Sequence, residues 1–131
     1  MLDWNRTALR TRVVAVVAAA VTVAAGLGVR AAFGGDFAKY AGDALYTLLL
    51  YTLVVAAAPR VRPAAAAAVA AGVSWVIEFA QLTGVPAELS ARSTPARLVL
   101  GATFNPPDLF WYAAGAAAGW LIHTLLRRRT P

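Results

Sequence analysis

Trp75-Val76-Ile77-Glu78-Phe79-Ala80-Gln81-Leu82 places a carboxylate and an amide one helical turn apart within an apolar segment. Helical period puts Glu78 and Gln81 on one face, together with Ser74 or Trp75. An ionisable side chain in an apolar helix is costly, so it normally faces the interior of a bundle and pairs with another group. The stretch therefore predicts an apolar helix whose last turns carry a polar site.

The composition around this stretch is typical of a membrane protein. The chain has 131 residues, of which 60% are hydrophobic and 14% are charged, whereas about 25% charged residues is usual in soluble domains. The net charge is +6, but the positive residues lie between long apolar runs. Orientation in a bilayer explains this pattern better than binding to nucleic acid does. The chain has no cysteine, which excludes disulfides and thiolate metal sites.

Four apolar segments predict an all-α integral membrane bundle that forms a single domain over residues 1–131. At about 1.5 Å rise per residue, each segment can cross a hydrocarbon core of about 30 Å. The helices are expected at about 13–33, 40–58, 64–82 and 108–126. The first segment has a rival interpretation as a signal peptide, because basic residues precede an apolar run. We favour a retained helix, because the run is long and the rest of the chain is also apolar.

A shorter helix is expected between the third and fourth segments. In the stretch 94–101, Thr94 can cap the helix, Pro95 suits its first position, and Gly101 can end it. We expect this helix to be interfacial or re-entrant. It lies within the longest connection of the chain, residues 83–107.

The Lys and Arg residues in the short connections predict the orientation of the chain. Eight of them belong to the N-terminus, the second connection and the C-terminus, and four belong to the first and third connections. This imbalance predicts that both termini lie in the cytoplasm. Arginine-rich and alanine-rich usage is typical of a GC-rich bacterial gene, so the bacterial inner membrane is the expected location.

This topology gathers the acidic residues, except Asp3, at the non-cytoplasmic end. Asp43 and Glu78 are expected about one turn, roughly 5 Å, below that surface. Arginine suits a partner there, because its planar fork binds oxyanions at two points. We therefore predict a pocket in which lysine and arginine hold an anionic group and carboxylates orient these cations. Its candidate residues are Lys39, Asp43, Tyr46, Glu78, Gln81, Arg92, Arg97 and Asp108.

An ordered set of short motifs resembles the bacterial membrane family known as domain of unknown function 2809. The motifs are the stretches 39–46, 78–82 and 97–101, with Arg92, Phe104, Asp108-Leu109, Tyr112 and Gly115. More distantly, the Glu-x-x-Gln helix and the Asp-x6-Gly-x3-Gly helix are similar to VanZ-like proteins. That family is linked to low-level resistance to the glycopeptide teicoplanin, which implies a cell-envelope ligand. The chain departs from the VanZ-like pattern at Tyr112, where an asparagine is usual.

Several functions remain open on this evidence. The leading one is a non-enzymatic protein that binds an anionic lipid or a glycopeptide-like ligand. The alternatives are a small transporter or proton-coupled carrier, a membrane enzyme with carboxylate acid–base chemistry, and an assembly partner whose ion pairs only hold the bundle together. His123, the one histidine, is expected at the opposite surface, which excludes Ser-His-Asp triads and His-rich zinc sites. No metal, cofactor or nucleic acid is expected, membrane lipid is the expected partner, and the oligomeric state is left open. The inner halves of the helices consist almost entirely of Ala, Leu and Val, and this apolar composition argues against a transport path.

Overall fold

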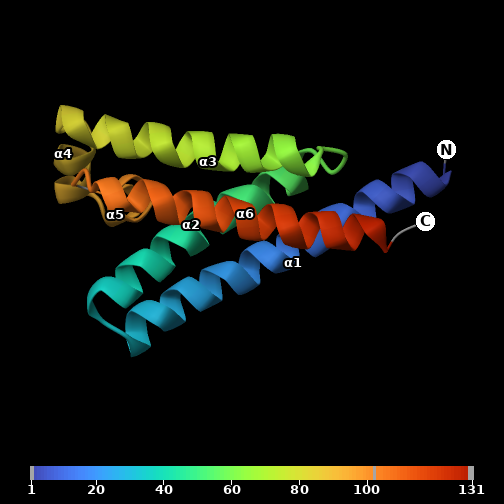
Figure 1. Cartoon of the computed structure of the whole chain (residues 1–131), viewed down its shortest axis with the longest axis horizontal. Coiled ribbons are helices and arrows are strands. Elements are labelled where there is room, and N and C mark those ends of the chain that lie inside the picture. Colours follow the sequence, from blue (N-terminus) through green and yellow to red (C-terminus); the bar gives the residue numbers. More distant parts are fainter. Residues whose placement is uncertain (1, 102, 130–131) are drawn as a thin grey trace.

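The computed structural model describes residues 2–101 and 103–129, and the side chains from residue 6 onward. Within these residues the chain is helical and forms no strand (Figure 1). Four helices, α1, α2, α3 and α6, are long and apolar enough to cross a membrane. The expected all-α fold with four such helices is confirmed. The elements are α1 (Leu2–Ala32), α2 (Gly35–Ala57), α3 (Pro63–Ala80), the 3₁₀ turn η1 (Gln81–Thr83), α4 (Val85–Arg92), α5 (Thr94–Leu100) and α6 (Pro106–Arg128).

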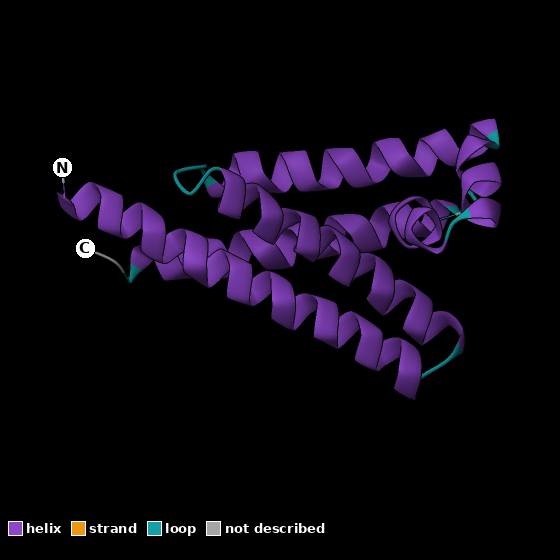
Figure 2. Cartoon of the chain, turned by 180° about the vertical axis from the view of Figure 1, so that it is seen from behind, coloured by secondary structure: helices purple, strands orange, loops and turns teal. Residues whose placement is uncertain are grey.

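Helices α2, α3 and α6 pack against one another, and α1 packs along α2. Both termini lie at one end of the bundle, and α4 and α5 lie at the opposite end (Figure 1). Seen from behind, the same helices are joined by short connections (Figure 2). The end that carries α4 and α5 also receives the start of α2, the end of α3 and the start of α6. This arrangement brings residues far apart in sequence to one end.

Small residues let the helices approach closely. A Cβ atom on Gly115 would lie 2.1 Å from the Ala44 carbonyl oxygen, and one on Gly119 would lie 2.8 Å from the Tyr51 ring. The spacing of these two glycines therefore serves packing of α6 on α2 within the chain. Large apolar side chains are exposed on the outer faces instead, among them Val21, at 62% exposure. Such faces suit contact with lipid.

The helix boundaries differ from the expectation at the starts of α1 and α2. Helix α1 begins at Leu2, because the basic N-terminal residues continue the helix. Helix α2 begins at Gly35, which has a positive φ of +64° and follows the short turn at Gly34. Asp43 consequently lies eight residues, or about 12 Å, from the start of this helix.

The connection between α3 and α6 holds two helices, of which α4 was not expected. Gly84, with φ of +80°, reverses the chain before α4, and a left-handed backbone favours glycine. The cap of α5 is Ser93, which accepts a hydrogen bond from the Ala96 N–H at 3.3 Å. The expectation that Thr94 caps this helix is therefore wrong. The helix ends before Gly101, as expected.

Candidate functional site

Glu78 lies at the centre of the polar groups and is fully buried. Its Oε1 accepts a hydrogen bond from the Asn105 backbone N–H at 2.6 Å, and its Oε2 accepts one from the Tyr112 hydroxyl at 3.0 Å. Asn105 precedes the two prolines that begin α6, in an extended conformation that favours a proline at the next position. The carboxylate of α3 thus fastens the start of α6.

Asp108 lies in the first turn of α6, where the helix dipole favours negative charge, and it is 5% exposed. Its Oδ1 accepts a hydrogen bond from the Asn105 side-chain amide at 2.9 Å and lies 3.8 Å from Lys39 Nζ. The Lys39 side chain is 46% exposed and its Nζ lies 5.9 Å from the Tyr40 ring centroid. Asp108 thereby links α6 to α2.

Asp43 completes the group from α2. Its carboxyl lies within interaction range of the Asp108 and Glu78 carboxyls and of the Lys39 ammonium. Within the described residues, its Oδ2 atom is buried and has no hydrogen-bond partner. Carboxyl groups from three helices therefore gather at this end, and the Lys39 ammonium interacts with two of them, those of Asp43 and Asp108. Asp43, Glu78 and Asp108 with Lys39 are called the carboxyl cluster. In the described part of the chain, no such group of side chains has a geometry that could hold a metal ion.

Polar groups continue along the bundle below the carboxyl cluster. Thr47 and Ser74, both fully buried, share a hydrogen bond of 2.8 Å between α2 and α3. Nearer the termini, the Tyr51 hydroxyl lies 2.7 Å from His123 Nδ1. Asp43, Thr47 and Tyr51 follow one another at four-residue intervals and so share a face of α2. These three residues with Ser74 and His123 are called the polar file.

Three side chains fasten the end of α5 to the bundle. The last carbonyl groups of a helix lack partners within the helix, and here successive ones receive side-chain hydrogen bonds. Tyr46 of α2 donates to the Val99 carbonyl at 2.8 Å, and Gln81 of η1 donates to the Leu100 carbonyl at 2.7 Å. The next carbonyl, that of Gly101, accepts from the Ser90 hydroxyl of α4. Tyr46 and Gln81 therefore hold the α4–α5 segment (residues 85–100) rather than the carboxyl cluster.

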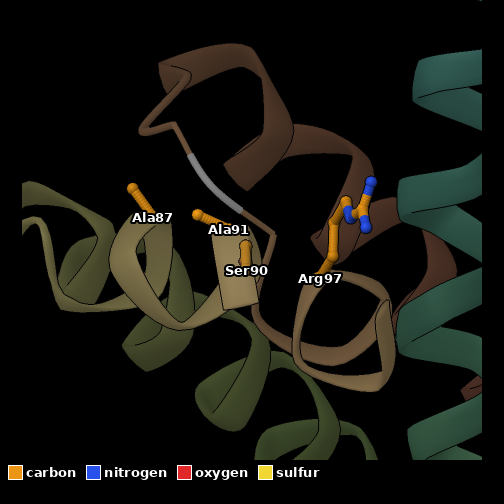
Figure 3. A pocket seen from close by; sticks show the side chains of 4 residues that line it. All are labelled: Ala87, Ser90, Ala91 and Arg97. Atoms are coloured by element: carbon orange, nitrogen blue, oxygen red, sulfur yellow. The ribbon is translucent and has the colours of Figure 1, made fainter. Parts of the chain in front are cut away.

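The two loop arginines lie on the α4–α5 segment. Arg97 of α5 lines a pocket of about 320 Å³ together with Ala87, Ser90 and Ala91 of α4 (Figure 3). Its guanidinium donates to the Thr94 hydroxyl at 3.3 Å. Arg92 pairs with Glu88, one turn earlier, at 3.2 Å.

The predicted site residues thus divide into groups. Lys39, Asp43, Glu78 and Asp108 come together as expected from their helical spacing. The expectation that the carboxylates orient Arg92 and Arg97 is not met in the described residues, because each guanidinium bonds within its own short helix. Sequence reasoning did not place Asn105 or Tyr112 among the site residues. Tyr112 could have been predicted, because it lies one helical turn after Asp108 and so shares its face of the helix. Asn105 could not, because it contacts Glu78 through its backbone N–H, which does not depend on the type of side chain.

Four helices are long and apolar enough to cross a membrane, and three of them each contribute one carboxyl group to the cluster. These features indicate the class, a multi-pass helical membrane protein with a polar centre near one end. The family model described as "Protein of unknown function (DUF2809)" matches residues 35–116, which is more than half of the chain. The chain belongs to this family, as its motifs predict. The match begins at the first residue of α2 and ends within α6, so it includes the whole carboxyl cluster and leaves out α1. No curated protein and no solved structure matches the chain.

Proposed function

We propose that this chain is a multi-pass protein of the bacterial inner membrane with both termini in the cytoplasm, and that its non-cytoplasmic end binds an anionic group. A lipid phosphate and the carboxylate of a glycopeptide-like ligand both have the required chemistry. The similarity to VanZ-like proteins supports a cell-envelope ligand. The observation that carries the proposal is the pocket of about 320 Å³ beside the Arg97 guanidinium.

Arg97 suits this role because little of its hydrogen-bonding capacity is used inside the protein. A guanidinium has five N–H donors, and in the described residues Arg97 bonds only to the neutral Thr94 hydroxyl. The opposite wall is formed by Ala87 and Ala91, which are small, and by Ser90. An anionic group entering the pocket therefore meets an uncompensated positive charge and little steric hindrance.

Arg92 and Lys39 would supply further positive charge at the same end. The Arg92–Glu88 pair is exposed on both sides, and exposed pairs contribute about 0–1 kcal/mol, so Arg92 can exchange its partner for a ligand at little cost. The Lys39 ammonium pairs with Asp108 while nearly half of the Lys39 side chain stays exposed. The carboxyl cluster, on this view, positions Lys39 and the start of α6.

The α4–α5 segment would hold the pocket in place before the ligand arrives. Bonds from Tyr46, Gln81 and Ser90 fix the end of α5 against three other elements. A preorganised site binds more tightly, because less conformational freedom is lost on binding. This attachment supports a binding pocket over a loosely tethered loop.

The test measures thermal unfolding of the full chain in detergent with added phosphatidylglycerol, phosphatidylcholine or teicoplanin. The variant is Arg97→Gln, and the matched control is Arg30→Gln, which removes the same charge from an exposed position near the same end. We expect phosphatidylglycerol or teicoplanin to stabilise the wild type and Arg30→Gln, and the gain to fall by at least half in Arg97→Gln. Equal gains in all three proteins would refute the proposal.

Proton transfer through the bundle is a second candidate, and the polar file favours it. The inner halves of the helices are mostly apolar, yet the few polar residues there face inward and bond in pairs. Successive members on α2 are about 6 Å apart along the axis, so water molecules would have to complete the path. Buried ionisable groups in membrane helices commonly mark such relays.

Proteoliposomes that contain an internal pH-sensitive dye test this second function. Under an imposed membrane potential, we expect proton entry above that of empty liposomes, and its loss in Asp43→Asn. The control is Asp36→Asn, which changes an exposed carboxylate in the first turn of the same helix. Proton entry that is the same in Asp43→Asn and the wild type would exclude the polar file as a path.

A further inference from the structure

A second pocket lies at the end of the bundle that carries both termini, away from the carboxyl cluster. It has a volume of about 300 Å³ and is lined by Ala8, Arg12, Ala58, Pro59 and Arg60. One guanidinium comes from α1 and the other from the α2–α3 connection. Its volume is at the lower end of the range for small-molecule sites.

The first wall of this pocket is fixed by a hydrogen bond. Arg12 Nε donates to the Ala56 carbonyl at 2.8 Å, and Ala56 lies in the last turn of α2, where carbonyl groups lack partners within the helix. This bond uses one of five N–H donors and sets the plane of the guanidinium. The terminal amino groups of Arg12 are the ones that a ligand in the pocket would meet.

The second wall is the α2–α3 connection, which is held in shape on its other side. The Val61 N–H donates to the Ala58 carbonyl at 2.9 Å and closes a turn around Pro59 and Arg60. Arg127 of α6 donates to the Val61 carbonyl at 3.2 Å. The pocket is therefore lined by α1 and a closed turn, and bonds to α2 and α6 hold these two walls in place.

Charge at this end strongly favours an anion. Eight arginines belong to it, and Asp3 is the only acidic residue in the same stretches of sequence. Guanidinium groups bind phosphate oxygens at two points, with geometry that an ammonium group lacks. Basic pockets beside membrane helices are suited to the headgroups of anionic lipids. The arginines are Arg6, Arg10, Arg12, Arg60, Arg62, Arg127, Arg128 and Arg129.

We infer that the pocket between α1 and the α2–α3 connection binds the phosphate of an anionic phospholipid headgroup through Arg12 and Arg60. A lipid fits better than a free phosphate ion, because the pocket adjoins apolar outer faces of α1. Val13 and Val16, just beyond Arg12, are 54% and 55% exposed and can contact the acyl chains of the same lipid. The site would tie α1, which otherwise packs mainly on α2, to the rest of the bundle.

The experiment measures binding of phosphatidylglycerol to the full chain in detergent by native mass spectrometry. The variant is Arg12→Gln/Arg60→Gln, and the matched control is Arg10→Gln/Arg128→Gln, which removes the same charge from the same end outside the pocket. A basic residue near an anionic headgroup contributes about fivefold in affinity, so we expect about thirtyfold weaker binding in the pocket variant. Arg60→Gln alone leaves the Arg12–Ala56 bond in place and should weaken binding about fivefold if the double variant does not fold.

The outcomes separate the possible sources of binding. Equal weakening by both double variants would reduce the site to a diffuse basic surface and overturn the proposal. Binding of phosphatidylcholine or of inorganic phosphate with the same affinity as phosphatidylglycerol would also overturn it. These variants leave Arg97 intact, so failure here is independent of the anion pocket at the other end.

Discussion

Replacing Glu78 with alanine removes the link between α3 and the start of α6, and we expect it to lower the free energy of unfolding by about 3 kcal/mol. Two hydrogen bonds are lost, from the Asn105 N–H at 2.6 Å and from the Tyr112 hydroxyl at 3.0 Å. Hydrogen bonds to charged groups contribute about 1.5–3 kcal/mol in soluble proteins, while those between membrane helices average about 0.6 kcal/mol. The larger value applies to Asn105, which lies in the connection before α6, and the smaller one applies to Tyr112, which lies in the membrane-length helix α6.

A double-mutant cycle with Tyr112→Phe isolates the second bond. We expect a coupling energy of about 0.6–1.7 kcal/mol, the range for hydrogen bonds between membrane helices. The assay is equilibrium unfolding by sodium dodecyl sulfate in mixed micelles, followed by circular dichroism. The control is Glu88→Ala, which breaks only the exposed pair with Arg92 and should cost less than about 0.5 kcal/mol. If Glu78→Ala is no more destabilising than Glu88→Ala, the buried carboxylate does not fasten α6 and the reasoning fails.

Three further perturbations test the packing, the α4–α5 segment and the orientation. Gly115→Ala would place a Cβ 2.1 Å from the Ala44 carbonyl oxygen, and such overpacking should cost about 1–3 kcal/mol in the same unfolding assay; an unchanged midpoint would contradict the close packing of α2 and α6. Gln81→Ala removes a bond to the end of α5, so hydrogen exchange should speed up in α5 and stay constant in α1, and equal rates in α5 would show that this bond is dispensable. The chain has no cysteine, so Ala87→Cys should react with an impermeant maleimide on intact cells, and Ala58→Cys only after permeabilisation; the reverse pattern would invert the proposed topology.

Much of the carboxyl cluster follows from helical period. Asp43 comes one turn after Lys39, and Asp108 begins its own helix, so the apolar runs alone place these groups at one end. Glu78 is the clearest case, because a carboxylate deep in an apolar segment has no favourable place outside a bundle. The burial of Glu78 could therefore be predicted without knowing the path of the chain between α3 and α6.

The positions of Arg92 and Arg97 depend on the path of the chain between α3 and α6, and for this reason they were not predicted correctly. Gly84 turns the chain through a left-handed conformation and starts α4, a helix too short and too polar for an apolar period to reveal. Each arginine then finds a partner within its own helix. The polar file was not predicted for another reason. A single Thr or Ser in an apolar helix does not indicate a partner, and Thr47 and Ser74 meet only because of how α2 and α3 are rotated about their axes.

The attachment of α5 through the carbonyl groups of three consecutive residues has an evolutionary consequence. Tyr46, Gln81 and Ser90 donate hydrogen bonds to backbone carbonyl groups. These carbonyl groups are present whatever side chains positions 99 and 100 carry. Relatives of this chain can therefore exchange those side chains without dislodging the segment.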